Sequence, residues 1–236
     1  MTIKDIHDII LFYTNKDQNG YISHEEIDMV LDRAQLSQFN EFYNNPKLYK
    51  QDNQVPVIGY GESQRINDAL SPFKSTYTFT NTDTVGGILN LPSNYMYLIA
   101  LYTSQFVSQL NRNVINPVTV LNEEELVYRL ESQVIPVTVD DPICIMNSSN
   151  KIQLFPDVPQ SGKVFYFRRP AVPKFGYTVP TGGSRTITYS DSLSTQLEWR
   201  EADINNIIIK ALGYYGLNMS AQDITQYSEI KNQQGN

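Results

Sequence analysis

Residues 15–26 read NKDQNGYISHEE, and this stretch decides how the N-terminal part of the chain folds. Asn and Asp side chains favour a turn, and Gly20 supplies the positive φ that a tight turn needs. Ser23 and Glu26 stand three residues apart, which is the spacing of a capping box at the start of a helix. The stretch therefore predicts a turn that leads directly into a new helix.

Apolar residues recur at three- and four-residue steps on both sides of this turn. They are Ile3, Ile6, Ile10 and Tyr13 before it, and Ile27, Val30, Leu31 and Ala34 after it. This spacing is typical of amphipathic helices. The second helix is expected to run to Phe42 or Tyr43, where two asparagines and Pro46 stop it. We therefore expect residues 1–50 to form a helical hairpin.

The same stretch resembles the calcium-binding loop of an EF-hand. Such a loop takes oxygen ligands at its first, third, fifth, seventh and twelfth positions, with glycine at the sixth. Those ligand positions hold Asn15, Asp17, Asn19, the Tyr21 carbonyl and Glu26. Only Asp17 and Glu26 would bring negative charge, and the sequence contains no second loop of this kind. Two interpretations stay open: a calcium site on these five residues, or a turn that needs no metal.

The middle of the chain changes from helical to alternating spacing. Aromatic residues alternate with threonine in STYTFT (75–80), and PICIMNSSNKIQLFP (142–156) has two apolar runs joined by a polar turn, as in a β-hairpin. Asn122 and Glu125 have the spacing of a cap before a short helix. We expect a mainly-β region over residues 51–189, with an extended Pro/Gly-rich arm over residues 170–183.

Helical spacing returns in the last fifth of the chain. One stripe comprises Ile204, Ile207, Ile208, Ala211, Leu212 and Tyr215. Ser220 and Asp223 predict the start of a further short helix. We expect helices over residues 190–236 that pack with the N-terminal helices. The order of helices, strands and helices predicts an α+β fold.

Composition excludes several classes of protein. The net charge of −7 argues against specific nucleic-acid binding, which needs a basic surface. The single cysteine, Cys144, excludes an internal disulfide, and its apolar neighbours predict a buried thiol. The longest apolar run, YMYLIALY, is far shorter than the roughly 20 residues of a membrane helix. We expect no signal peptide, no membrane contact and synthesis in a reducing compartment.

The residues that usually carry catalysis are scarce. There are two histidines, His7 and His24, each beside acidic residues and away from any serine or cysteine motif, and both are expected on the surface. One cysteine and two histidines cannot build a zinc cluster. The glycine pairs lack the lysine that a phosphate-binding loop needs. We therefore expect no enzymatic activity and no cofactor, calcium excepted.

Several segments together resemble a known group of proteins. They are the start of the chain with NKDQNGYISHEEI, then LPSNYMYLIAL, DPICIMNSSNKIQLFP, VFYFRRPAVPKF and the ending LGYYGLNMSAQDITQYSEIKNQQG. These segments resemble virion structural proteins of short-tailed phages of Bacteroidetes, the crAss-like group included. The resemblance implies a ring or adaptor protein in the neck or tail, made in the host bacterial cytoplasm and located in the virion.

The resemblance also implies partners. A ring protein of this kind contacts copies of itself, the portal and other neck or tail proteins, while DNA passes through the ring without specific binding. The 16 tyrosines agree with subunit contacts, because Tyr is enriched in interfaces. The arm over residues 170–183 would reach a neighbouring subunit, or would be an ordinary surface loop. The alternative function is a calcium-dependent binding module or adhesin that uses residues 15–26.

Overall fold

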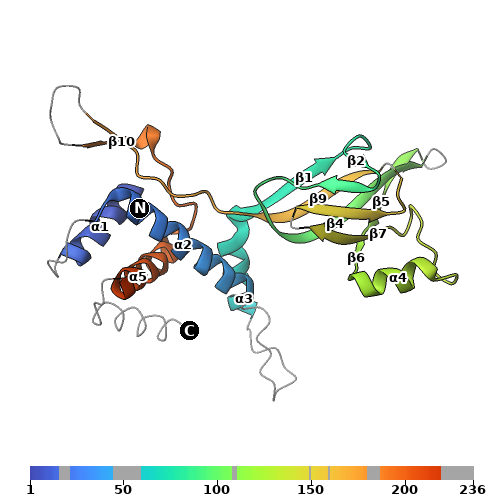
Figure 1. Cartoon of the computed structure of the whole chain (residues 1–236), viewed down its shortest axis with the longest axis horizontal. Coiled ribbons are helices and arrows are strands. Elements are labelled where there is room, and N and C mark those ends of the chain that lie inside the picture. The colour runs from blue at the N-terminus through green and yellow to red at the C-terminus, as the bar shows by residue number, and fades with distance from the viewer. Residues whose placement is uncertain are drawn as a thin grey trace, which may run out of the picture. The chain divides into compact units, whose positions relative to one another are not determined.

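The computed structural model describes residues 1–15, 22–44, 60–107, 111–148, 150–158, 160–179 and 187–218 (Figure 1). Helices and β-sheets are both present, which confirms the expected α+β class. The chain divides into two compact units, a helical unit (1–72 and 170–236) and a strand unit (73–169). The helical unit is thus built from two separate parts of the sequence. The limits of the two units differ from the expected ranges, which were 1–50, 51–189 and 190–236.

Four α-helices form the described part of the helical unit. They are α1 (Ile3–Asn15), α2 (His24–Asn44), α3 (Tyr60–Leu70) and α5 (Glu201–Asn218), with two 3-10 turns at Ser71–Phe73 and Asp191–Leu193. The capping box before α2 is formed as predicted. The backbone N–H of Glu26 donates to Ser23 Oγ at 3.3 Å, and the N–H of Ser23 donates to Glu26 Oε2 at 2.9 Å.

The core of the helical unit follows the predicted stripes. All six stripe residues of α5 are buried, as are Ile3, Ile6 and Ile10 of α1. Trp199, just before α5, packs on Phe39 and Phe42 of α2, with ring centroids 6.5 and 6.0 Å apart. Tyr13, the last residue of the spacing noted in α1, is 46% exposed. The short helix expected after Ser220 lies outside the described residues.

The expected Pro/Gly-rich arm packs on its own chain over its described part. Phe175 is buried, and Lys174 forms an antiparallel β-bridge with Thr195. The two-residue strand β10 (Tyr177–Thr178) pairs with β11 (Thr188–Tyr189). Residues 180–183 of the arm lie outside the described residues. Residues 170–179 therefore form part of the helical unit.

The strand unit contains two sheets. The first is antiparallel, in the order β1-β9-β4-β5; its strands are β1 (Lys74–Phe79), β9 (Ser161–Arg168), β4 (Tyr95–Val107) and β5 (Arg112–Pro117). The second has the order β2-β3-β8-β7-β6; its strands are β2 (Thr84–Val85), β3 (Ile88–Asn90), β8 (Lys151–Phe155), β7 (Ile143–Ser148) and β6 (Thr119–Val120). The predicted hairpin over residues 142–156 is confirmed as β7 and β8.

One apolar cluster joins the two sheets. Phe79 and Val164 from the first sheet belong to the same core as Leu89, Ile152 and Leu154 from the second. The sheets therefore pack face to face as a sandwich. In the first sheet a Cβ on Gly162 would lie 2.1 Å from the Tyr102 carbonyl oxygen, so only glycine fits there.

Two further predictions hold in the strand unit. Cys144 is fully buried, and burial raises the pKa of its thiol to about 12, so the sulfur stays protonated at neutral pH. Helix α4 (Glu123–Glu131) begins at the predicted capping box of Asn122 and Glu125. In the described ranges, no helix has both the length and the apolar character needed to cross a membrane.

Candidate functional site

The predicted calcium ligands fall mostly outside the described residues. Asp17, Asn19 and Tyr21 lie there, and Asn15 is the last residue of α1. Glu26 lies in the first turn of α2, where its carboxylate accepts the Ser23 N–H. Over the described ranges, no three His, Cys, Asp or Glu side chains are grouped as a metal ion would require. The calcium site stays one of the two interpretations of residues 15–26.

The two histidines meet instead of lying apart on the surface. His7 Nδ1 is 3.0 Å from His24 Nδ1, and His7 Nε2 is 3.0 Å from Asp28 Oδ1. His7 is fully buried, so its expected surface position is wrong, while His24 is half-buried. A sequence signal did exist, because His7 lies four residues after Ile3 and three before Ile10, on the buried face of α1.

The chain that returns from the strand unit covers this histidine pair. The Phe175 ring stacks on His24 and on His7, with centroids 4.0 and 4.7 Å apart. The backbone N–H of Phe175 donates to both carboxylate oxygens of Asp28 at 3.0 Å. Asp28 belongs to α2 and accepts hydrogen bonds from His7 of α1 and from Phe175. It therefore joins three segments of the chain. We call His7, His24, Asp28 and Phe175 the His–Asp junction.

The hydrogen bonds of the junction place one of its protons. A carboxylate only accepts, so His7 Nε2 carries the proton that it donates to Asp28. The Nδ1 atoms of His7 and His24 lie 3.0 Å apart, so one of the two rings donates to the other. Burial, followed by the charge of His7 when it is protonated, lowers the pKa of His24, although Glu25, Asp28 and Asp8 act in the opposite direction. The junction therefore favours a neutral His24.

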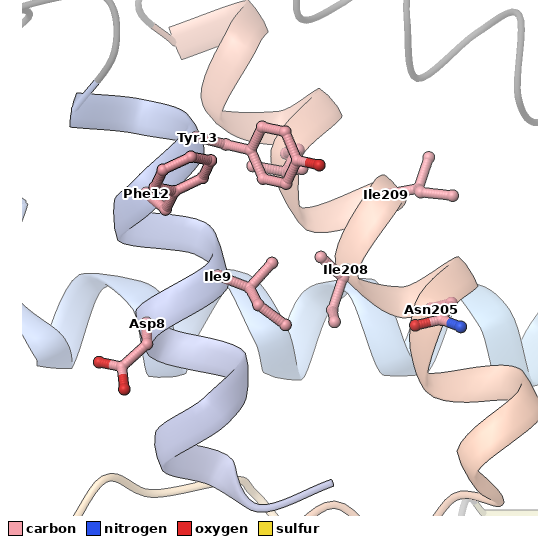
Figure 2. A pocket seen from close by; sticks show the side chains of 8 residues that line it. Asp8, Ile9, Phe12, Tyr13, Asn205, Ile208 and Ile209 are labelled. Carbon is pink, nitrogen blue, oxygen red and sulfur yellow. The ribbon is translucent and has the colours of Figure 1, made fainter.

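A groove of about 560 Å³ runs between α1 and α5 within the helical unit (Figure 2). Its apolar lining comprises Ile9, Phe12, Tyr13, Ile208, Ile209 and Leu212. Figure 2 shows Ile9 and Ile208 pointing into the space between the helices, while the Asp8 carboxylate points away from α5. Phe12 is 62% exposed at the groove wall. Such a groove suits apolar side chains of a partner better than a charged ligand.

Helix α4 is the second apolar surface. None of its nine residues is buried, and Val127, Tyr128 and Leu130 are 55%, 78% and 49% exposed. The Arg129 guanidinium holds the helix to the loop that follows, by hydrogen bonds to the Ile135 carbonyl and the Asp141 carboxylate. A nine-residue helix without tertiary packing is marginal in water. The helix therefore presents its apolar side chains as an exposed surface.

Comparisons with known proteins leave the chain without an assigned family. No protein-family model matches it, and a search of curated proteins finds no match. Three described features bear on function. They are the His–Asp junction, the α1/α5 groove and the exposed face of α4.

We expect the helical unit to lose stability as the pH falls below 6.5. The pKa of His24 is lowered in the folded chain, so the unfolded chain takes up a proton first. This stabilisation is fully present above pH 6.5, which is the pKa of His24 in the unfolded chain. It is lost as the pH falls through the lower pKa that His24 has in the folded chain. Urea unfolding followed by the fluorescence of Trp199 measures this between about pH 8 and about pH 5.

The variant His24→Phe is the matched control, because it keeps a ring that stacks on Phe175 but cannot titrate. Its unfolding midpoint should depend less on pH than that of the wild type. The carboxyls of Asp5 and Glu25 also have lowered pKa values, from 3.8 and 4.5, so they act below this pH window. An unchanged pH dependence in His24→Phe would contradict the assignment to His24.

We expect a calorimetric titration with calcium to give no binding heat. The Glu26 carboxylate is engaged in the capping box, and only Asp17 would add a second charged ligand. The variant Glu26→Gln separates helix capping from metal binding, because glutamine also serves in a capping box. Its free energy of unfolding should change by less than about 0.5 kcal/mol. Calcium binding in the wild type that Glu26→Gln abolishes would instead establish the metal site.

Proposed function

We propose that the chain is a non-enzymatic structural component of a phage virion, a homo-oligomeric ring or adaptor protein that connects portal and tail. The resemblance of the quoted segments to virion proteins of crAss-like and related phages motivates the proposal. The observation that carries it is the exposed apolar face of α4, whose residues are all outside the protein core. Its partners are copies of itself, the portal and other neck or tail proteins, and it acts in the virion.

Helix α4 gives the proposal an energetic basis. Val127 and Leu130 are three residues apart and lie on one face of the helix, with Leu126 beside them. Complete burial of one such side chain contributes about 1.5–3 kcal/mol relative to leaving it exposed. A subunit contact that covers this face recovers a stabilisation that the single chain lacks. The acidic first turn, Glu123 to Glu125, would lie at the polar rim of that contact.

The presence of two different apolar surfaces supports a ring. The α1/α5 groove and α4 are different surfaces, carried by different units of the chain. Contacts between unlike surfaces repeat head to tail, and they close into a ring when the rotation per subunit allows it. In this proposal the N-terminal helical hairpin and the C-terminal helices supply the groove side, and the strand unit supplies α4.

The remaining features support a role without catalysis. Histidine is the commonest general base in enzymes. Both histidines of this chain, His7 and His24, take part in the contacts of the His–Asp junction. The Cys144 thiol is buried and protonated. The net charge of −7 disfavours electrostatic retention of DNA, which suits a ring through which DNA passes.

We expect the wild-type chain to sediment as a closed homo-oligomer and Val127→Asp to shift it towards the monomer. A carboxylate on the exposed α4 face would have to be desolvated in a subunit contact, which costs at least about 1–3 kcal/mol per contact. Sedimentation velocity over a range of protein concentrations measures the shift. Circular dichroism should be unchanged, because Val127 is 55% exposed in the single chain.

Val85→Asp is the matched control. Val85 is 77% exposed and lies in β2, which forms part of neither proposed surface. The same substitution there should leave the oligomer intact. A wild-type chain that stays monomeric at all concentrations, or an oligomer that Val127→Asp leaves unchanged, would contradict the proposed role of α4.

A further inference from the structure

A short two-stranded strap lies against the His–Asp junction. We define the strap as residues 174–178 and 188–195. Its two parts are joined by the pairing of β10 with β11, by the bridge between Lys174 and Thr195, and by the Ser190 N–H, which donates to the Gly176 carbonyl at 2.8 Å. These contacts are internal to the strap, so they do not fasten it to the helices.

The strap is fastened to the helices at the junction itself. Phe175 supplies the ring that stacks on both histidines, and its N–H donates to Asp28. Two residues further on, the Tyr177 hydroxyl donates to Glu25 Oε1 at 2.9 Å. On the α2 side, these contacts all lie within residues 24–28. The hold on the strap therefore depends on the state of the residues around His24.

The two histidines have room for only one proton between them. Their ring centroids are 5.2 Å apart and their Nδ1 atoms 3.0 Å apart, so the two nitrogens face each other along the line between the rings. At this distance one nitrogen donates and the other accepts. His7 Nε2 already donates to Asp28. If both rings were fully protonated, two N–H groups would therefore meet head to head.

The packing prevents the rings from relieving such a contact in place. His7 is fully buried on α1. The Phe175 ring stacks on His24 and on His7, with angles of 4° and 26° between the ring planes. His24 is half-buried in the first turn of α2, so it is the ring that can move to water. Its departure would remove one half of the surface on which Phe175 stacks.

The neighbouring charges favour one positive charge on the histidine pair. Asp8 of α1 and Glu25 and Asp28 of α2 are the acidic groups that act on His24. Tyr215 of α5 adds no charge, because burial raises the pKa of its hydroxyl. These carboxylates attract a charged imidazole, but they do not remove the head-on contact that a second charge creates.

We propose that the His–Asp junction is an acid-operated latch: when both histidines are fully protonated, the strap is released from α1 and α2 while the helices stay folded. The packing of α2 with α5 is independent of the strap, since Trp199 packs on Phe39 and Phe42. Such local opening requires less free energy than unfolding of the whole unit.

The latch is a local event, distinct from the loss of stability of the whole helical unit with falling pH. It goes beyond the proposed structural role and does not depend on it. All its residues belong to the helical unit of a single chain, so a monomer would carry the latch as an assembled ring would. Failure of one proposal leaves the other standing.

Hydrogen–deuterium exchange of the full chain tests the latch, read by mass spectrometry with a fragmentation that resolves single amides. Protection factors are compared at about pH 7.5 and about pH 5.5, on either side of the ordinary histidine pKa of about 6.5. The Phe175 amide donates to Asp28 and should lose about 10-fold in protection at the lower pH. Uptake of one proton on opening changes the open population by up to about 10-fold per pH unit. The amides of α5 should keep their protection.

Two variants separate titration from packing. His24→Phe keeps a ring for Phe175 to stack on but cannot be charged, so protection of the Phe175 amide should no longer depend on pH. Tyr177→Phe is the matched control, because it removes the hydrogen bond to Glu25 without removing a titrating imidazole. Protection should fall at both pH values in this control, and the ratio of about 10-fold between them should remain.

A second measurement on the wild type does not depend on any variant. Slow deuterium exchange at the C2 carbon of each imidazole reports the pH at which that histidine becomes charged. Loss of Phe175 protection should coincide with the second of the two charges. Loss of protection while both rings are neutral would overturn the proposal. So would a Phe175 protection factor that is unchanged between the two pH values, an equal loss in His24→Phe, or a simultaneous loss at the amides of α5.

Discussion

The Asp28 carboxylate holds His7 Nε2 and the Phe175 N–H at 3.0 Å, and the helical unit depends on this contact. The whole strand unit lies in sequence between the two parts of the helical unit, so the returning chain has to be fixed to α1 and α2. A hydrogen bond to a charged group contributes about 1.5–3 kcal/mol, more than a typical surface ion pair. Stacking of Phe175 on both imidazoles closes the same junction.

The strand unit has its own core and carries the exposed helix α4. Its core joins both sheets without any residue of the helical unit. Helix α4 connects the parallel strands β6 and β7, a crossover whose helix normally covers a sheet face. Here the helix buries none of its residues, so the usual packing rule fails at this element. Such local departures are expected where a protein meets a partner.

Local signals in the sequence predicted the local structure. The capping boxes at Ser23 and Asn122, the buried stripe of α5 and the β7–β8 hairpin each depend on residues close together in the chain. Long-range contacts were missed for a physical reason. The stacking of His7 on Phe175 joins distant parts of the chain, and the order of the first sheet requires β9 to insert between β1 and β4. No short segment encodes such pairings, and the acidic neighbour Asp8 favoured a surface position for His7.

The candidate surfaces were only partly predictable. Spacing placed α4 and its cap, but it did not indicate that Val127 and Leu130 are exposed. We propose that the chain acts by assembling into a ring. Electron microscopy of the purified full chain tests it most directly: closed rings of uniform diameter are expected, and a field that contains only single chains would contradict the claim.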